Sequence, residues 1–194
     1  ETPIPVDHQN GFTLLVAVVL SAQSTDKKVN ELTKELFKVA PSAEKMYKLG
    51  ENKIYNYIKQ LGLAKTKAKN THNLSKIIYE KFNNIVPNSF QELESLPGVG
   101  HKTASVVMSQ VFGVPSFPID THIHRLSQRW GLTSGKNVIQ TEKDLKRSFP
   151  KHLWNKLHLQ IIFYGREYCS ARGCNGTNCN LCKELYPKRK KAII

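Results

Sequence analysis

Apolar residues recur at helical spacing along almost the whole chain, as in the set Ile54, Ile58 and Leu61. Sustained alternation of apolar and polar residues, which is typical of strands, is scarce. The pattern predicts an all-α protein. The expected helices lie near residues 12–22, 27–38, 42–48, 51–61, 66–83, 89–95, 101–112, 120–130, 141–148 and 152–167.

Residues that start or stop helices stand at many of these boundaries. Ser42, Ser89 and Thr141 carry hydroxyl groups that can cap a helix N-terminus. Gly50 and Gly62 are typical helix breakers. These residues support the presence of separate short helices along the chain.

The segment 113–118, Gly-Val-Pro-Ser-Phe-Pro, combines one glycine with two prolines between two helical patterns. Such a segment interrupts helices and is a candidate crossing between two lobes. We therefore expect one domain of residues 4–114 and a second of residues 115–194 together with residues 1–3. Helical periodicity disappears after Glu167, where a cysteine-rich loop begins.

The chain is strongly basic. It has 29 Lys and Arg residues and 15 Asp and Glu residues, which give a formal net charge of +14 over 194 residues. This excess favours a polyanionic partner over a merely basic soluble protein. The basic segment 187–191 is interpreted as a solvated end, with phosphate contact or a nuclear address as alternatives. The most apolar run, residues 12–22, is about half the ~20 residues of a membrane span, so we expect a buried helix and no membrane association.

The segment 96–104, Leu-Pro-Gly-Val-Gly-His-Lys-Thr-Ala, lies between two helical patterns. Pro97 ends the first helix, and Gly98 and Gly100 allow positive φ angles and close backbone approach. Two helices joined by a tight glycine hairpin expose backbone N–H groups that can hold a DNA phosphate. The alternative is an ordinary connector between helices.

Lys102 falls in the first turn of the second helix, where the helix dipole disfavours a cation. One interpretation is a lysine of lowered pKa whose neutral amine attacks an electrophilic carbon and forms a Schiff base. The other is an exposed lysine that binds phosphate. Asp120 follows eighteen residues later, and on its own it fits an N-cap of the next helix.

Several ordered segments together resemble the helix-hairpin-helix glycosylase superfamily and, within it, the endonuclease III family. The likeness covers essentially the whole chain: segments 12–26, 62–63, 67–68, 96–104, 119–122 and 165–166, and the cysteines. The resemblance implies a helical barrel domain with a helix-hairpin-helix motif, followed by a helical domain that carries an iron–sulfur cluster.

The resemblance also implies an activity, that of a bifunctional DNA glycosylase and abasic-site lyase for oxidised pyrimidines. In that family the residue matching Lys102 attacks C1′, and the residue matching Asp120 assists it. The alternatives are a monofunctional or mismatch-directed glycosylase, which Lys102 disfavours, and a non-catalytic DNA-binding module. The expected partner is duplex DNA with damaged pyrimidines or abasic sites, bound by a monomer.

Base removal from a duplex requires extrusion of the nucleotide. By similarity, Gln23 reaches into the vacated space and Leu63 wedges the stack apart, while Gly98, Gly100 and His101 contact DNA. From the residues alone, Leu63 would be a core residue and Gln23 a surface polar residue. His101, His122 and His124 receive no catalytic role.

The cysteines follow the pattern Cys169-x4-Cys174-x4-Cys179-x2-Cys182. Four sulfurs this close predict a metal site, which the pattern alone leaves open between tetrahedral zinc and an iron–sulfur cluster. The resemblance implies a [4Fe-4S] cluster, with zinc or a defective site as alternatives. Family members usually have gaps of six, two and five residues, so the ligand set departs from the family here.

Clustered cysteines indicate a reducing compartment. The N-terminus shows no basic segment followed by an apolar core, so nothing in it predicts secretion. We expect a bacterial cytoplasm, at the nucleoid, or the nucleus or mitochondrion if the source is eukaryotic.

Overall fold

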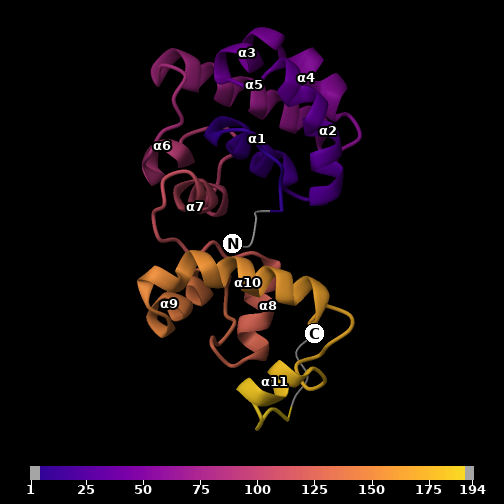
Figure 1. The fold of residues 1–194 in the computed structure, drawn as a ribbon, viewed down its shortest axis with the longest axis vertical. Helices are drawn as coiled ribbons and strands as arrows, with labels where there is room; N and C mark the ends of the chain where they lie inside the picture. The colour runs from indigo at the N-terminus through magenta and orange to yellow at the C-terminus, as the bar shows by residue number, and fades with distance from the viewer. Residues whose placement is uncertain (1–4, 191–194) are drawn as a thin grey trace. The chain divides into compact units, whose positions relative to one another are not determined.

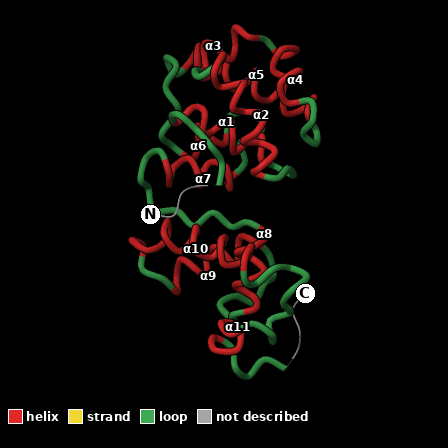
Figure 2. The backbone as a smooth tube through the Cα atoms, turned by 45° about the vertical axis from the view of Figure 1, so that its right-hand side comes forward, coloured by secondary structure: helices red, strands yellow, loops and turns green. Residues whose placement is uncertain are grey.

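The computed structural model describes residues 5–190, which form α-helices and loops without a strand (Figure 2). The predicted all-α class is therefore confirmed. The chain divides into two compact units between Val114 and Pro115, inside the glycine- and proline-containing segment. We call residues 5–114 the N-terminal unit and residues 115–190 the C-terminal unit. The expected placement of residues 1–3 with the second domain lies outside the described residues.

The N-terminal unit is built around one apolar helix. Its helices are α1 (Gly11–Ser21), α2 (Asp26–Val39), α3 (Ala43–Leu49), α4 (Glu51–Ile58), α5 (Ala64–Lys81), α6 (Phe90–Glu94) and α7 (His101–Gln110) (Figure 1). Helix α1 packs against α2, α5 and α7, and Leu15, Val16 and Ala17 in it are fully buried. Because apolar residues cover most of its circumference, α1 is an internal helix of a single core.

Helix α1 begins with a reciprocal cap. The Asn10 side chain accepts a hydrogen bond from the Thr13 backbone N–H at 3.0 Å, and the Thr13 hydroxyl accepts one from the Asn10 N–H at 2.9 Å. This arrangement satisfies two backbone donors at the start of a buried helix. It sets where α1 begins.

The C-terminal unit has a smaller core between its helices. These are α8 (Thr121–Arg129), α9 (Val138–Ser148), the 3₁₀ turn η1 (Lys151–Leu153), α10 (Trp154–Glu167) and α11 (Asn180–Leu185). Helix α8 packs against both α9 and α10. Ile123 and Leu126 of α8 are fully buried there, and three of the four cysteines that follow α10 belong to the same core.

All ten predicted helices are present, with shifts at their ends. Ser42 and Ser89 cap α3 and α6 as expected. Thr141 is not a helix start, because Asn137 caps α9, which begins at Val138, three residues before the predicted beginning. Helix α11 was not predicted. Among the described residues, no helix has the length and apolarity needed to cross a bilayer.

Candidate nucleic-acid interface and metal centre

Two apolar side chains of the glycine hairpin between α6 and α7 are buried in the core. Leu96 and Val99 are 2% and 6% exposed and anchor the hairpin in the core. Gly98 has φ +80°, and a Cβ there would lie 2.8 Å from Asn70 Nδ2, so both conformation and space require glycine. Among the described contacts, the N–H groups of Gly98 and Gly100 have no acceptor. The predicted hairpin is thus present, with free donors of the kind that bind a phosphate.

Lys102 lies in the first turn of α7, directly after the hairpin, and is exposed. Within residues 5–114, no described carboxylate or hydrogen-bond acceptor holds its ammonium group. His101 beside it is also exposed, and its Nδ1 is 2.7 Å from Glu94 Oε1 while its ring stacks on Phe90 at 5.6 Å. An exposed lysine therefore follows the open N–H group of Gly100 by two residues. A DNA contact by His101 stays a prediction.

Asp120 belongs to the C-terminal unit, where it caps α8. Its Oδ1 accepts a hydrogen bond from the Ile123 backbone N–H at 2.8 Å, so the capping role is real. Its second carboxylate oxygen has no described partner and remains available. His122, two residues on, lies 3.3 Å from an Arg125 nitrogen through its Nδ1, and burial lowers its pKa against the opposing effect of Asp120. This agrees with a structural role for His122.

The two residues predicted to enter the DNA stack lie on neighbouring turns of the N-terminal unit. Gln23 and Leu63 both adopt left-handed backbone conformations, with φ 54° and 58°. Residues other than glycine rarely adopt a left-handed backbone conformation, and such conformations concentrate at functional sites. Leu63 is 60% exposed, so its assignment to the core from the residues alone is wrong. The turns are adjacent, because a Cβ on Gly62 would lie 3.6 Å from the Gln23 carbonyl oxygen.

A buried lysine links these two turns, and sequence reasoning gave it no role. Lys67 in α5 is 5% exposed, and its Nζ donates to the Ser24 hydroxyl at 2.8 Å. Burial lowers the pKa of Lys67. A cation that is desolvated in this way costs stability, so the bond to Ser24 helps to hold the Gln23 turn against α5.

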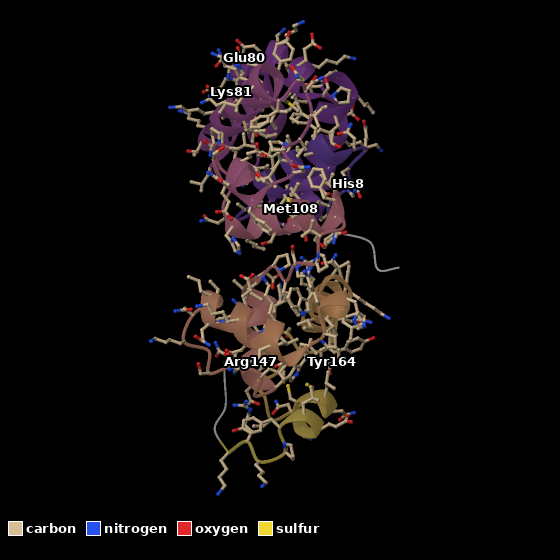
Figure 3. All side chains as sticks on the ribbon, turned by 90° about the vertical axis from the view of Figure 1, so that its left-hand side faces the viewer. His8, Glu80, Lys81, Met108, Arg147 and Tyr164 are labelled. Atoms are coloured by element: carbon tan, nitrogen blue, oxygen red, sulfur yellow. The ribbon has the colours of Figure 1, made fainter. Side chains whose placement is uncertain are left out.

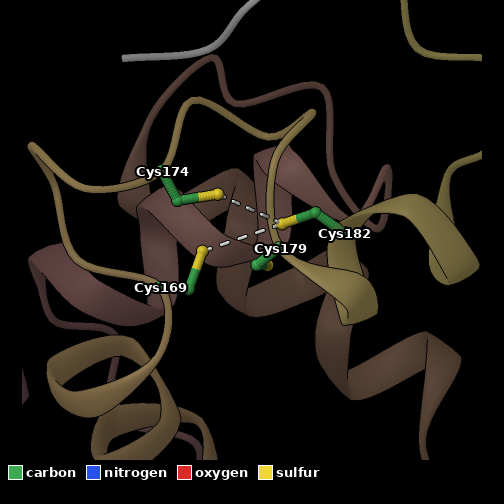
Figure 4. Close-up of side chains that lie close together, drawn as sticks. All are labelled: Cys169, Cys174, Cys179 and Cys182. Carbon is green, nitrogen blue, oxygen red and sulfur yellow. Dashed lines mark hydrogen bonds between the residues drawn. The ribbon is translucent and has the colours of Figure 1, made fainter.

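The four cysteines come together at one point of the C-terminal unit, as predicted (Figure 4). Cys169 Sγ lies 3.7 Å and Cys174 Sγ 4.0 Å from Cys182 Sγ, and all four sulfurs lie within 4.8 Å of one another. Three of the cysteines are buried and Cys179 is partly exposed. No disulfide joins them. Four converging thiols in one small volume can hold a metal.

Hydrogen-bond donors surround these sulfurs. The Gly176 N–H donates to Cys174 Sγ at 3.4 Å. The hydroxyl of Tyr164, a residue labelled in Figure 3, donates to Cys179 Sγ at 3.7 Å. Burial raises the pKa of Cys174, but hydrogen bonds from the N–H groups of Gly176 and Cys179 have the opposite effect. The net result is a pKa lowered to about 6. These donors favour the thiolate form of Cys174, whereas burial raises the pKa of the Cys169 and Cys182 thiols.

Arginines of α8 hold the cysteine loop in place. Arg129 is fully buried and donates to Cys169 Sγ at 3.3 Å and to the Ser170 carbonyl at 2.9 Å. Arg125 donates to the Cys169 carbonyl at 3.0 Å. Sequence reasoning gave neither arginine a role. No sequence signal marks Arg129 as buried, since it lies at the end of an otherwise amphipathic helix.

Residues 16–151 match the HhH-GPD superfamily of base excision DNA repair proteins. Endonuclease III of Bacillus subtilis (strain 168) is 42% identical over 191 residues, which cover 96% of this chain and 87% of that protein. The chain belongs to the endonuclease III family of HhH-GPD repair proteins. The predicted family is thus confirmed.

Solved structures of endonuclease III agree with this membership. A trapped endonuclease III–DNA covalent intermediate superposes with a TM-score of 0.86 at 38% identity, covering 95% of this chain and 90% of that one. A non-covalent endonuclease III–DNA complex gives a TM-score of 0.87 at 37% identity, covering 97% and 91%. As an HhH-GPD family member, the chain is a DNA glycosylase of base excision repair.

Proposed function

We propose that this glycosylase is bifunctional: it removes oxidised pyrimidines from duplex DNA and then cleaves the strand as an abasic-site lyase. The observation that carries the proposal is the exposed Lys102 amine in the first turn of α7, beside the unpaired N–H groups of Gly98 and Gly100. A phosphate held by those donors would bring the adjoining sugar close to the amine.

The chemistry requires one nucleophile and one source of negative charge. The Lys102 nitrogen, deprotonated for attack, bonds to C1′ while the C1′–base bond breaks and the base leaves with a proton. Opening of the sugar ring leaves an iminium. Loss of a C2′ proton then expels the 3′ phosphate by β-elimination, and water releases the lysine. Asp120 would stabilise the positive charge that develops on the sugar.

Two turns of the N-terminal unit suit extrusion of the damaged nucleotide. Leu63 offers an exposed apolar side chain that can wedge between bases, and Gln23 an exposed amide that can pair with the base left behind. The net charge of +14 supports binding to the phosphate backbone. Endonuclease III relatives have been solved in complex with DNA, one of them as a covalent intermediate, which supports both duplex DNA as partner and covalent chemistry.

The remaining parts of the proposal come from the resemblance alone. They are the preference for ring-saturated pyrimidines such as thymine glycol, action as a monomer, and a bacterial cytoplasmic location. The cysteine loop would act as a metal-bound staple for a segment that has no core of its own. Resemblance to the family favours a [4Fe-4S] cluster in it.

The test offers the protein four duplexes, which contain thymine glycol, an abasic site, an adenine–guanine mismatch or no damage. Borohydride is added to each to reduce any iminium to a stable adduct. We expect cleavage and a covalent adduct with the first two duplexes only. Base release without strand cleavage would show a monofunctional glycosylase, and binding without release a non-catalytic module; either result would overturn the proposal.

Replacing Leu63 with glycine separates the wedge role from a structural role. We expect the free energy of unfolding to change by less than about 1 kcal/mol, because glycine tolerates φ 58° and the lost side chain is 60% exposed. We expect damage-specific binding to fall roughly 10-fold, about 1.4 kcal/mol, since the stack is no longer wedged. Thermal unfolding and fluorescence anisotropy measure the two effects.

The matched control for this change is Ile85→Ala, which removes another exposed apolar side chain, 69% exposed, from the same unit. Its affinity for damaged DNA should equal that of the wild type. If Leu63→Gly binds damaged DNA as tightly as this control, Leu63 is not a wedge.

A further inference from the structure

We infer that the cysteine loop of this chain holds a single tetrahedrally coordinated metal ion of the zinc class, in place of the [4Fe-4S] cluster that the family resemblance implies. The inference rests on the sulfur positions, the spacing of the ligands and the contacts around them. It concerns metal identity alone and does not depend on the proposed lyase activity.

The separations between the sulfurs match one central ion. Cys169 Sγ and Cys174 Sγ lie 3.7 and 4.0 Å from Cys182 Sγ, and no pair among the four exceeds 4.8 Å. For an ion with four Zn–S bonds of about 2.3 Å, tetrahedral geometry puts the sulfurs about 3.8 Å apart. The observed set is therefore close to the required size.

A cubane cluster requires a wider arrangement. Each thiolate in a [4Fe-4S] site binds a different iron, so four irons and four sulfides lie between the cysteine sulfurs. Sulfurs on opposite sides of that core cannot be in mutual contact. Cys169 and Cys182 are in contact here, and all four sulfurs lie within 4.8 Å of one another (Figure 4).

The ligand spacing leads to the same conclusion. Gaps of four, four and two residues fall in the range of two to four that is usual between paired cysteine ligands of zinc. Cys179 is the N-cap residue of α11 and Cys182 lies in its first turn, so one short helix supplies two ligands. The cysteine spacing of this chain also differs from that of the family, and a different spacing is consistent with a different metal.

Surrounding contacts fix the sulfurs at these short separations. Cys169 accepts from the buried Arg129, Cys174 from the Gly176 N–H and Cys179 from the Tyr164 hydroxyl. Gly176 has φ +89°, and a Cβ there would lie 3.1 Å from Arg189 Cδ and 3.3 Å from Arg129 Cγ, so the turn beside Cys174 requires glycine and packs closely against two arginines. Ligands oriented by such outer contacts are already placed for one ion.

The decisive measurement is the metal content of the full chain purified without oxygen from cells supplied with both iron and zinc. Elemental analysis should find about one zinc per chain, with no acid-labile sulfide and no brown colour. About four irons and four sulfides per chain would overturn the inference. A chain that lacks any metal under these conditions would overturn it equally.

Cobalt provides a second readout that does not depend on what the cells supply. Apoprotein titrated with Co²⁺ should saturate at one ion per chain and show the visible bands of a tetrahedral cobalt thiolate. Cys179→Ser should weaken the thiolate-to-cobalt absorption, because one of the four sulfurs is lost. Thr177→Ala, a control in the same loop, should leave it unchanged. Saturation at any other ratio, or an unchanged spectrum in Cys179→Ser, would contradict a four-sulfur single-ion site.

Discussion

Replacing Lys102 with glutamine is expected to abolish the borohydride adduct and to slow strand cleavage at an abasic site by at least roughly 10³-fold, because the amine that forms the iminium is gone. Lys102 is exposed in the first turn of α7, so glutamine should be accommodated without loss of packing. Single-turnover cleavage of a labelled duplex measures the rate, and gel analysis after reduction measures the adduct.

Folding and DNA affinity serve as controls for this variant. Thermal unfolding should match that of the wild type, and binding to undamaged duplex should weaken only slightly, as expected for the loss of one surface charge. Lys45→Gln removes another exposed lysine of the same unit, in α3, and should cleave at the wild-type rate. Equal adduct formation by Lys102→Gln and wild type would exclude Lys102 as the nucleophile.

The helices could be predicted from the sequence because their signals are local. Apolar periodicity marks the buried faces, and Ser42 and Ser89 cap helices through contacts only three residues long. The start of α9 was misplaced since Asn137 and Thr141 are both cap-forming residues, and only the structure shows that Asn137 is used. Local signals thus locate helices better than they locate their ends.

The proposed wedge role of Leu63 comes from the family resemblance and not from physical reasoning on the residues. A leucine beside a glycine normally belongs to a core, and nothing in the residues alone announces that Leu63 adopts φ 58° with its side chain exposed. The same holds for the left-handed Gln23. These conformations depend on tertiary contacts, such as that between Lys67 and Ser24, which are 43 residues apart in the chain.

The cysteine loop shows a different limit of sequence reasoning. Clustering of the four cysteines predicted a metal site, but α11 escaped prediction because six residues hold too little periodicity to indicate a helix. The loop is held by Arg129, whose complete burial arises from contacts with residues about forty positions away. Spacing alone therefore left the metal open, and the sulfur separations are what distinguish one ion from a cluster.

Asp120 is expected to show the second large effect, and its two roles can be separated by the choice of substitution. Asparagine caps helices about as well as aspartate, so Asp120→Asn should keep the bond to the Ile123 N–H and the stability of α8. It removes the negative charge, and we expect base release from thymine glycol to slow by roughly 10²–10³-fold, the usual cost of losing one preorganised electrostatic contact in a transition state. Single-turnover base release and thermal unfolding measure the two quantities.

Asp120→Ala completes the comparison, because it removes the charge and the cap together. We expect it to lose as much activity as Asp120→Asn and, in addition, about 1 kcal/mol of stability, since the Ile123 N–H at the start of α8 is left without its acceptor. If Asp120 were only a cap, the asparagine variant would release the base at the wild-type rate and only the alanine variant would be impaired. Equal stability with unequal activity between wild type and Asp120→Asn would instead assign the carboxylate charge to the chemistry.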